Sequence, residues 1–440
     1  MMSVKNYVEK NVFEMSQERI KLIFDEFENV LIAFSGGKDS GVCLNLFYDY
    51  AKNTNQLHKL NFYHQDYEAG YNFTRDYCLR EFENKKDVAR RFWLCLPINA
   101  QCSVSMFQEF WTPWDENKKE IWVNNMPDED WVIHEHNVPY EFEKGTYGGV
   151  ARRQFSKWFA SEFGKTAVIV GLRGDESLSR LAVITSQHRT HMYKDIRYSK
   201  KVNEDTYNFY PIYDWRTEDI WIANAKFEWD YNKMYDLFYQ AGVPLDSMRT
   251  ASPFHMSGQD TLKLFKIIEP QTWSKMVNRV NGVNFTGIYG GTTAMGWRNI
   301  KKPEHFTWEQ YAKFLIKTLP KDFKERIEYN ITRIMNTWEN DGYGRNPRVI
   351  KTMEDEGVIL EKTGVDDPRC TKPGFYEIVK IKSGMPDETS EPMFRKVPSW
   401  KGVCITILKN DFTCQYMGVS RSDKDMAKRR EAMKKYKAIL

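Results

Sequence analysis

The fold of this chain is decided by one stretch, Val30-Leu31-Ile32-Ala33-Phe34-Ser35-Gly36-Gly37-Lys38-Asp39-Ser40. Its first five residues form a short apolar run, which is typical of a strand buried on both faces of a parallel sheet. Two glycines follow, and beyond Ser40 the apolar residues recur at helical spacing. The stretch therefore predicts a strand, a tight turn and a helix, in that order.

Such a turn is suited to holding phosphate. Gly36 and Gly37 lack Cβ atoms, so backbone N–H groups can approach an anion, and the start of the following helix adds its positive dipole end. Ser35 and Ser40 supply hydroxyl donors, and Lys38 supplies a positive charge. Asp39 either caps the helix or helps to hold Mg²⁺ bridged to phosphate. The alternative is a capped turn that matches this pattern by accident.

The strand-and-helix alternation continues along the chain. Further strands are predicted at 60–64, 92–96 and 166–170, and helices are predicted at 16–28, 40–50, 72–83 and 151–163. This order predicts an α/β fold with a doubly wound, mostly parallel sheet, in which ligands bind beyond the carboxyl ends of the strands.

A second polar segment follows the strand at 166–170. It reads Gly171-Leu172-Arg173-Gly174-Asp175-Glu176-Ser177, with Arg180 three residues further on. Gly171, Arg173 and Arg180 are predicted to contact the nucleotide, because forked guanidinium donors clamp phosphate or sulfate. Asp175 and Glu176 would orient these arginines or, with Asp39, hold Mg²⁺. The alternative is an internal network of salt bridges.

These segments resemble a known group of proteins. Ser35 to Ser40 resembles the PP-loop signature S-G-G-x-D-S of ATP pyrophosphatases and phosphoadenylyl-sulfate (PAPS) reductases, and Gly171 to Arg180 resembles the arginine segment of the PAPS reductases. Pro211-Ile212-Tyr213-Asp214-Trp215 and Asp219-Ile220-Trp221 resemble a third segment of that branch, which we interpret mainly as architecture. The resemblance covers roughly residues 25–255. It is closest to the immunoglobulin-binding-regulator A-type proteins, which are often encoded beside a ParB-like partner.

The resemblance implies a PP-loop (HUP-like) domain that binds ATP or PAPS with Mg²⁺. In that family the segment His64-Gln65-Asp66-Tyr67-Glu68 lies beside the adenosine and the second substrate, so Asp66 and Glu68 become candidate contacts. A plain surface loop is the alternative reading. Arg152 and Arg153 would add positive charge to the cleft, or else lie on an exposed helix face. The spacing of His188 and His191 does not make a metal site.

The sequence departs from the reductases at their reactive cysteines. Sulfonucleotide reductases attack with a thiolate from a C-terminal Glu-Cys-Gly tail, whereas this chain has no cysteine after Cys414. The iron–sulfur relatives need clustered cysteines, and the corresponding segment, Gly242 to Pro253, contains none. We therefore expect neither thiolate reduction nor an iron–sulfur cluster.

The remainder of the chain is less specific. We expect three regions: 1–255 as the nucleotide-binding domain, 256–345 as mainly helical, and 346–440 as irregular or mixed with a basic terminal helix. Residues 421–437 contain eight Lys/Arg and three Asp/Glu, although the net charge of the whole chain is only +4. That segment would bind nucleic acid or an acidic partner, or would form a solvated helix.

Bulk features indicate a cytoplasmic protein. The seven cysteines have no paired spacing, which favours reduced thiols. No apolar run approaches the roughly 20 residues of a membrane helix, and no signal peptide is evident.

Three functions remain open. The first is an ATP-using enzyme that cleaves between the α and β phosphates, with Lys38 and Arg173 as catalytic residues. The second is a PAPS-binding protein related to sulfonucleotide reduction or sulfur transfer. The third is a nucleotide-sensing regulator or defence component that acts with a ParB-like partner or nucleic acid.

Overall fold

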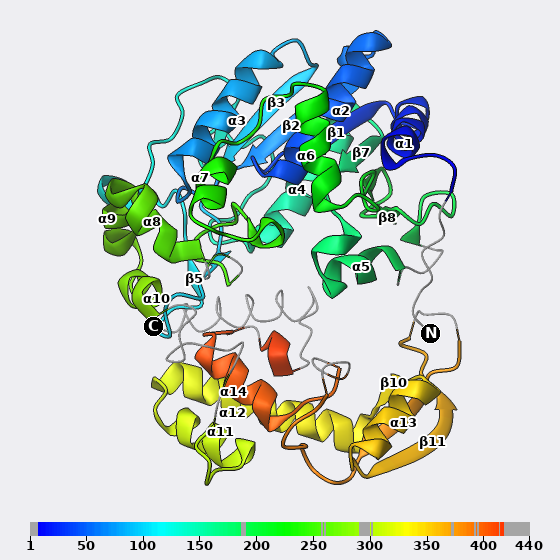
Figure 1. Cartoon of the computed structure of the whole chain (residues 1–440), viewed down its shortest axis with the longest axis vertical. Coiled ribbons are helices and arrows are strands. Elements are labelled where there is room, and N and C mark those ends of the chain that lie inside the picture. The colour runs from blue at the N-terminus through cyan, green and yellow to red at the C-terminus, as the bar shows by residue number, and fades with distance from the viewer. Residues whose placement is uncertain are drawn as a thin grey trace. The chain divides into compact units, whose positions relative to one another are not determined.

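The computed structural model of the chain forms two compact units (Figure 1). It describes residues 8–185, 191–256, 258, 261–289, 300, 302–370, 374–390, 393, 396–412 and 414–417. The first unit comprises Met1–Gln101 and Phe110–Asn281, and the second comprises Cys102–Glu109 and Gly282–Leu440.

A seven-stranded sheet organises the first unit, in the order β6-β3-β2-β1-β7-β9-β8. Every neighbouring pair is parallel except β8 with β9, which is antiparallel. The strands are β1 (Asn29–Ala33), β2 (Leu60–Gln65), β3 (Arg90–Cys95), β6 (Val132–His134), β7 (Thr166–Ile169), β8 (Ser199–Lys201) and β9 (Thr206–Phe209). The predicted doubly wound, mostly parallel sheet is confirmed.

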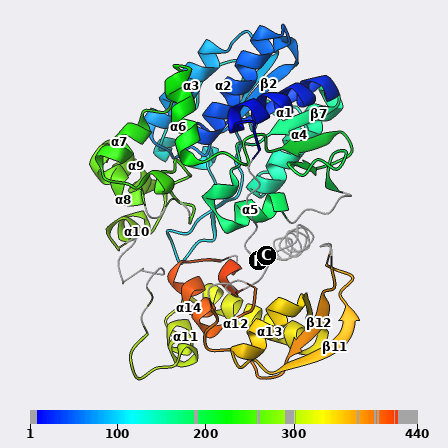
Figure 2. The ribbon, with the colours of Figure 1, turned by 45° about the vertical axis from the view of Figure 1, so that its right-hand side comes forward.

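Both faces of this sheet are buried, which explains the continuous apolar run at its centre. In β1, Val30 and Ile32 pack in one hydrophobic cluster, and Leu31 packs in another on the opposite face. Figure 2 shows the sheet among its helices. The helices of this unit are α1 (Val12–Glu26), α2 (Lys38–Asn53), α3 (Asn72–Asn84), α4 (Gly148–Phe163), α5 (Leu178–Thr185), α6 (Thr217–Lys226), α7 (Met234–Gln240), α8 (Leu262–Ile268) and α9 (Pro270–Arg279).

The region between β3 and α4 has little regular structure. It includes β6 and a short antiparallel hairpin, β4 (Ala100–Gln101) with β5 (Phe110–Trp111). Trp114 is buried and holds a positive φ of 55°. Tryptophan burial, rather than strand pairing, provides much of the order here.

The first unit extends beyond the predicted boundary at residue 255. Helices α8 and α9 pack on it: the Phe265 ring stacks on Tyr71 with 3.5 Å between ring centroids, and Glu269 accepts hydrogen bonds from the backbone N–H of Asn72. The strand-and-helix rhythm ends near 255, but these contacts continue to residue 281. The compact units therefore differ from the predicted division at 255 and 345.

The second unit combines helices with a small sheet. Its helices are α10 (Val283–Tyr289), α11 (Trp308–Lys317), α12 (Lys321–Asn336), α13 (Pro347–Asp355) and α14 (Trp400–Leu408). Its three antiparallel strands, in the order β10-β12-β11, are β10 (Tyr343–Arg345), β11 (Leu360–Asp366) and β12 (Glu377–Ile381). A core that includes Trp308, Ile327 and Val379 joins them. The predicted helical character of this region is confirmed.

Regular elements occur within the region predicted as irregular or mixed. The stretch 346–400 contains α13, β11 and β12, of which β11 is largely exposed and shows no apolar alternation. Residues 400–408 form α14, which is buried along nearly its whole length and has no polar stripe. The basic segment 421–437 lies outside the described residues.

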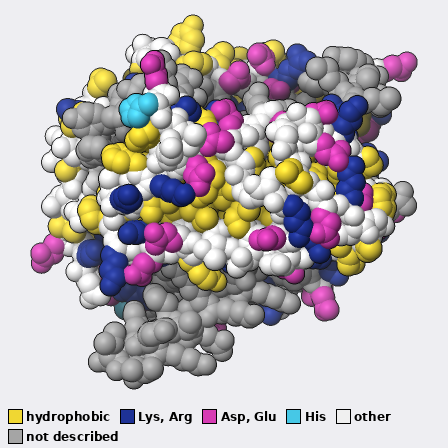
Figure 3. Space-filling model, turned by 90° about the horizontal axis from the view of Figure 1, so that it is seen from below, with side chains coloured by type: hydrophobic (Ala, Val, Ile, Leu, Met, Phe, Trp, Pro, Cys, Tyr) yellow, Lys and Arg dark blue, Asp and Glu magenta, His cyan; other side chains and the backbone are white. Residues whose placement is uncertain are grey.

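The described surface carries mixed charge on the face shown in Figure 3, where acidic and basic side chains are interspersed around apolar ones. Among the residues that the structure describes, no helix has both the length and the apolar character that a membrane crossing requires.

Candidate functional site

The loop from Ser35 to Ser40 forms the predicted tight turn between β1 and α2. Gly36 has a φ of +74°, and a Cβ atom there would lie 2.5 Å from the Cys78 sulfur. Gly37 is the N-cap residue of α2 and provides no side-chain cap. Asp39 lies in the first turn of the helix rather than at its cap. The N-cap glycine thus leaves the first backbone N–H groups of α2 without a cap from its own side chain, although the Lys38 N–H donates to the Tyr235 hydroxyl at 3.0 Å.

The two loop serines stabilise the turn. The backbone N–H of Ser35 donates to Ser40 Oγ at 3.1 Å, and the two hydroxyl oxygens lie 2.9 Å apart. Ser40 Oγ also donates to the carbonyl of Gly37 at 3.0 Å. Ser40 is therefore a positioning residue of the loop in this state, whereas Ser35 also lines the adjacent pocket.

Two buried cations converge on Asp39. Arg173 Nε donates to Asp39 Oδ1 at 2.5 Å, and Lys38 Nζ lies 3.3 Å from Asp39 Oδ2. Lys38 is 5% exposed and Arg173 is 2% exposed. Arg173 Nη1 is buried and has no hydrogen-bond partner within the described part of the chain. The cluster therefore holds one guanidinium donor ready for another acceptor.

Gly171 allows this cluster to form. It directly precedes the Arg173 segment, and a Cβ atom on it would lie 2.9 Å from the Asp39 carbonyl carbon and oxygen. The chain after β7 thus passes against the first turn of α2. Gly171, Lys38, Asp39 and Arg173 therefore lie together at the start of α2.

The other charged residues of that segment lie differently. Arg180 is exposed and pairs with Glu176, with 3.4 Å between Arg180 Nε and Glu176 Oε2. Asp175 is also exposed. The described residues include no group of three or more His, Cys, Asp or Glu that could hold a metal ion. The predicted Mg²⁺ set of Asp39, Asp175 and Glu176 is therefore not assembled.

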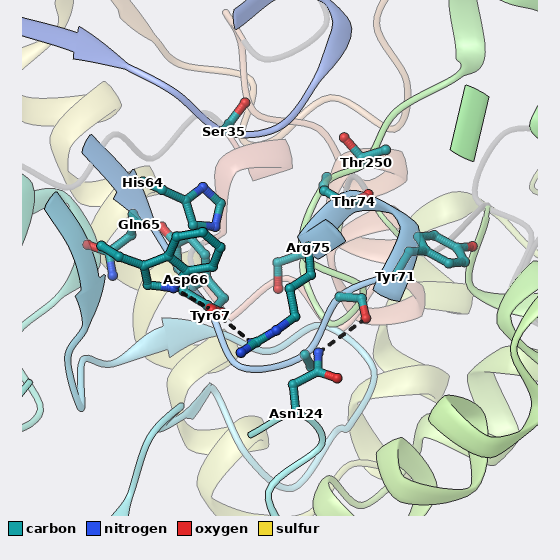
Figure 4. Close-up of a pocket in the computed structure, with 15 residues that line it drawn as sticks. Ser35, His64, Gln65, Asp66, Tyr67, Tyr71, Thr74, Arg75, Asn124 and Thr250 are labelled. Carbon is teal, nitrogen blue, oxygen red and sulfur yellow. Dashed lines mark hydrogen bonds and ion pairs between the residues drawn. The ribbon is translucent and has the colours of Figure 1, made fainter. Parts of the chain in front are cut away.

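A pocket opens beside the loop, at the carboxyl ends of β1 and β2 (Figure 4). The volume of the pocket, including the solvent space at its open mouth, is about 550 Å³. Its walls come from the loop, the end of β2, the start of α3 and a later segment of the chain. The lining residues are Ser35, His64, Gln65, Asp66, Tyr67, Ala69, Gly70, Tyr71, Thr74, Arg75, Trp93, Asn124, Thr250, Ala251 and Ser252.

Asp66 is an acidic group of this pocket. Its carboxylate accepts a hydrogen bond from Trp93 Nε1 at 2.9 Å and another from the backbone N–H of Glu68 at 2.7 Å. Arg75 extends from α3 toward it, with 3.4 Å between Arg75 Nη1 and Asp66 Oδ2 (Figure 4). Asp66, a predicted ligand contact, thus lines the pocket and is held in a fixed orientation by these partners.

His64 is a second titratable group that lines the pocket. Its Nδ1 lies 3.0 Å from the Phe34 carbonyl oxygen, and its ring contacts that of Trp93 at 4.4 Å. Burial lowers the pKa of His64, because desolvation disfavours the charged imidazolium. The neutral ring is therefore the stable form.

Glu68 does not line the pocket, contrary to prediction. It is fully buried, and its two carboxylate oxygens accept from Arg279 Nε at 2.7 Å and Nη2 at 2.8 Å. The backbone N–H groups of Trp114 and Val123 donate to the same carboxylate. These four donors leave no direction open to a ligand, so Glu68 holds the loop after β2 in place.

Sequence reasoning missed several residues around the loop. Asn232 Nδ2 donates to the Gly36 carbonyl at 2.9 Å, and the Tyr235 hydroxyl accepts from the Lys38 backbone N–H at 3.0 Å. Thr250 Oγ1 lies 3.5 Å from that hydroxyl. These residues carry no motif and lie about 200 positions from the loop, so no local signal pointed to them.

The other segments singled out in the sequence make defined contacts in the structure. Arg152 Nη1 donates to the Tyr67 hydroxyl at 2.8 Å, so it adjoins the pocket through Tyr67. Asp214 pairs with the buried Arg19, and Asp219 accepts from the Arg216 backbone N–H at 2.7 Å at the start of α6. This agrees with the architectural interpretation of that segment. His188 lies outside the described residues.

The cysteines are not placed for thiolate chemistry. All seven are free thiols, and six of them are buried. Desolvation raises the pKa of Cys43, Cys78 and Cys95, and it raises the pKa of Cys404 to about 12. No cysteine is among the described residues that line the pocket.

Comparison with protein families agrees with this geometry. Residues 113–241 match the model of the phosphoadenosine phosphosulfate reductase domain, and residues 242–428 match that of a domain of unknown function (DUF3440). Residues 113–241, which lie in the first unit, are thus similar to the PAPS reductase domain.

One relative aligns over nearly the whole chain, and it identifies the family more specifically than the two domain matches do. The chain is 30% identical over 414 residues to the uncharacterized protein YbdN of Escherichia coli (strain K12), and the alignment covers 93% of this chain and 91% of that protein. The chain belongs to the YbdN family.

Solved structures show more distant likenesses. A Candida auris PAPS reductase, in a phosphate complex, is 12% identical with a TM-score of 0.29, over 53% of this chain and 93% of that one. A Candida glabrata FMN adenylyltransferase is 12% identical with a TM-score of 0.27, over 53% of this chain and 62% of that one. The chain thus spans less than two thirds of the adenylyltransferase.

Proposed function

We propose that this protein binds an adenine nucleotide at the Ser35–Ser40 loop and cleaves ATP between the α and β phosphates. The α-phosphorus would form a new bond to an acceptor, which becomes adenylylated and so activated, or to water, which gives AMP, while pyrophosphate leaves. The observation that carries this proposal is the buried Arg173, whose Nη1 has no partner among the described residues while Asp39 holds its Nε. Such an arrangement favours an anionic ligand beside Lys38.

The roles follow from where negative charge would grow. Lys38 and Arg173 are fixed by Asp39 before a ligand arrives, so they can stabilise a pyrophosphate leaving group without first reorganising. The backbone N–H groups at the start of α2 would bind phosphate oxygens. Asp66 and Arg75 would contact the nucleoside part, because they line the pocket next to the loop.

Magnesium has no assigned step in this proposal. Both oxygens of Asp39 face cations, and Glu176 pairs with Arg180. These residues do not fit a protein-built Mg²⁺ cage. Thiolate reduction is also not proposed, because the described pocket lining contains no cysteine and the buried thiols have raised pKa values.

A second candidate is the binding of PAPS without reduction by this chain. The match of residues 113–241 to the PAPS reductase domain favours it, and the spare Arg173 nitrogen would suit a sulfate as well as a phosphate. The ParB-like partner and the nucleic-acid contact stay predictions, since the basic segment lies outside the described residues.

Calorimetric titration with ATP and with PAPS, each with and without Mg²⁺, tests both candidates. We expect wild type to bind ATP, and Lys38→Ala or Arg173→Met to weaken binding by at least about tenfold, or 1.4 kcal/mol. Lys52→Ala, an exposed change near the end of the same helix, is the matched control. Chromatography should then detect AMP and pyrophosphate.

The outcomes separate the candidates. Binding of PAPS in preference to ATP, without AMP release, would replace the first with the second. If neither ligand binds wild type, or if both variants bind as wild type does, the loop is not a nucleotide site in this protein.

A further inference from the structure

A segment from the region matched by the domain of unknown function forms one wall of the pocket. Thr250, Ala251 and Ser252 line the pocket together with Ser35 of the loop. Just before them, the Met248 carbonyl accepts a hydrogen bond from Lys38 Nζ at 3.3 Å. The segment 248–252 therefore lies directly against the loop, and all of these residues belong to the first unit.

This segment is fixed on both sides of the pocket. Arg249 Nη2 donates to the Glu176 carbonyl at 3.2 Å, which ties the segment to the turn Gly174–Glu176 that follows β7. On the other side, the ring of Phe254 packs edge-on against Trp111 with 4.8 Å between centroids. The backbone N–H of His255 donates to the Ser252 carbonyl at 3.1 Å. The position of Ser252 is thus determined by its neighbours before a ligand binds.

The Ser252 hydroxyl is an unpaired polar group within the described part of the chain. Its Oγ is buried and has no hydrogen-bond partner among the residues that the structure describes. A buried hydroxyl without a partner is destabilising, and most such groups in folded proteins are paired. An unpaired hydroxyl on the wall of a pocket is explained if a ligand supplies its acceptor.

We infer that Ser252 is a ligand-binding residue, whose hydroxyl donates a hydrogen bond to a phosphate oxygen of the nucleotide held by the Ser35–Ser40 loop. The assignment to phosphate rests on the same segment holding Lys38 through Met248. The inference rests on the proposed function. It adds a binding residue that lies outside residues 113–241, the part of the chain that matches the PAPS reductase domain. Residues 248–252 thereby acquire a role in nucleotide recognition.

Ser252→Ala tests the inference because it has opposite effects on the free and bound protein. Without ligand, the variant should melt at the same temperature as wild type or higher, because an unpaired buried hydroxyl is removed. With ATP, its Kd should rise about tenfold, as expected for a lost hydrogen bond to a charged group. Adenosine, which has no phosphate, should bind both proteins equally.

Two further variants complete the design. Ser247→Ala removes an exposed hydroxyl just before the segment 248–252, outside the pocket lining, and should bind ATP as wild type does. Ser252→Cys keeps a side chain of similar shape with a weaker donor, so its Kd should fall between those of wild type and Ser252→Ala. Titration calorimetry and thermal unfolding provide both readouts.

The outcomes of these binding and unfolding measurements separate the inference on Ser252 from the proposed function. If wild type binds ATP and Ser252→Ala binds it equally well, the inference fails while the proposed function stands. If adenosine loses as much affinity as ATP, the phosphate assignment fails. A lower melting temperature of the free variant would show that the hydroxyl is structural, and no binding by wild type would overturn the proposed function itself.

Discussion

At the scale of single residues, the site contains charges that burial would otherwise disfavour. Lys38 and Arg173 are almost fully buried, and each lies against Asp39. A buried charge is tolerated when it is paired and hydrogen-bonded. One carboxylate paired with two cations leaves a local excess of positive charge. A bound phosphate group would neutralise this charge.

His64 makes the stability of the protein depend on pH. Burial lowers its pKa in the folded state, whereas the unfolded chain has the ordinary value of about 6.5. As pH falls below 6.5, the unfolded state binds protons first, so stability decreases until the pH reaches the folded-state pKa. We expect His64→Asn to reduce the drop in melting temperature between pH 7.5 and 5.5.

Thermal unfolding across that pH range measures the effect. His136→Asn is the control, because His136 is exposed. Partial burial also lowers the pKa of His255, so the slope should be reduced rather than abolished. A slope that is the same in His64→Asn as in wild type would show that His64 is not the group responsible.

The buried pair of Glu68 and Arg279 is the second residue-scale test. Arg279→Met leaves the Glu68 carboxylate buried without its cation, and we expect a loss of about 3–5 kcal/mol. The double variant Glu68→Gln with Arg279→Met should regain part of that loss, because the uncompensated charge is gone. Arg80→Met breaks a more exposed pair with Asp230 and should cost at most about 1 kcal/mol.

Calorimetric unfolding of these variants distinguishes a pair that positions the loop after β2 from an incidental contact. If Arg279→Met is no less stable than Arg80→Met, the pair does not hold the loop. Recovery in the double variant would attribute the loss to the unpaired carboxylate.

At the scale of elements, the site depends on how closely the chain after β7 approaches α2. In Gly171→Ala the new Cβ would lie 2.9 Å from the Asp39 carbonyl and 3.0 Å from the Ser40 nitrogen, both backbone atoms. One of the two segments must move, at a cost of about 1–3 kcal/mol. We expect lower stability and weaker ATP binding, because Arg173 moves away from Lys38.

Gly70→Ala is the control for stability, since nothing lies within 4 Å of its Cβ position. Melting temperature and ATP affinity are measured for Gly171→Ala. An unchanged melting temperature would mean that the two segments can separate without loss, and that their approach does not set the geometry of the site.

The elements that the sequence predicted are those with local signals. An apolar run, a glycine pair and a helical repeat all lie between Val30 and Tyr50, so β1, the loop and α2 could be read directly. Arg173 reached the loop because β1 and β7 are parallel neighbours whose carboxyl ends lie at one edge of the sheet. No local pattern in the sequence indicates which distant residue a polar side chain will pair with. Glu68 was assigned to the pocket, but its partner Arg279 lies 211 residues away.

At the scale of the whole molecule, the family boundary and the structural boundary do not coincide. The match to the domain of unknown function begins at residue 242, whereas the compact unit that holds the pocket extends to Asn281. The residues between these points include the pocket wall at 250–252 and the helices α8 and α9. That part of the matched region belongs structurally to the unit that holds the pocket.

This overlap predicts how the protein tolerates truncation. A fragment ending at residue 281 keeps Arg279 against Glu68 and Glu269 against the start of α3. A fragment ending at residue 255, where the strand-and-helix pattern stops, loses both contacts. It buries an unpaired carboxylate at Glu68 and leaves the Asn72 N–H without its acceptor, and each loss is of the order of 1–5 kcal/mol. Against a total stability of about 5–15 kcal/mol, their sum is large.

We therefore expect the fragment 1–281 to unfold cooperatively and to bind ATP, and the fragment 1–255 to be unstable or aggregated. Calorimetric melting and ATP titration of both fragments, with the full chain as reference, provide the comparison. If the two fragments melt at the same temperature and bind ATP equally, α8 and α9 are accessory to the first unit and its boundary lies at 255. If 1–281 is also unfolded, residues beyond 281 stabilise the nucleotide-binding unit, and the two units depend on each other for folding.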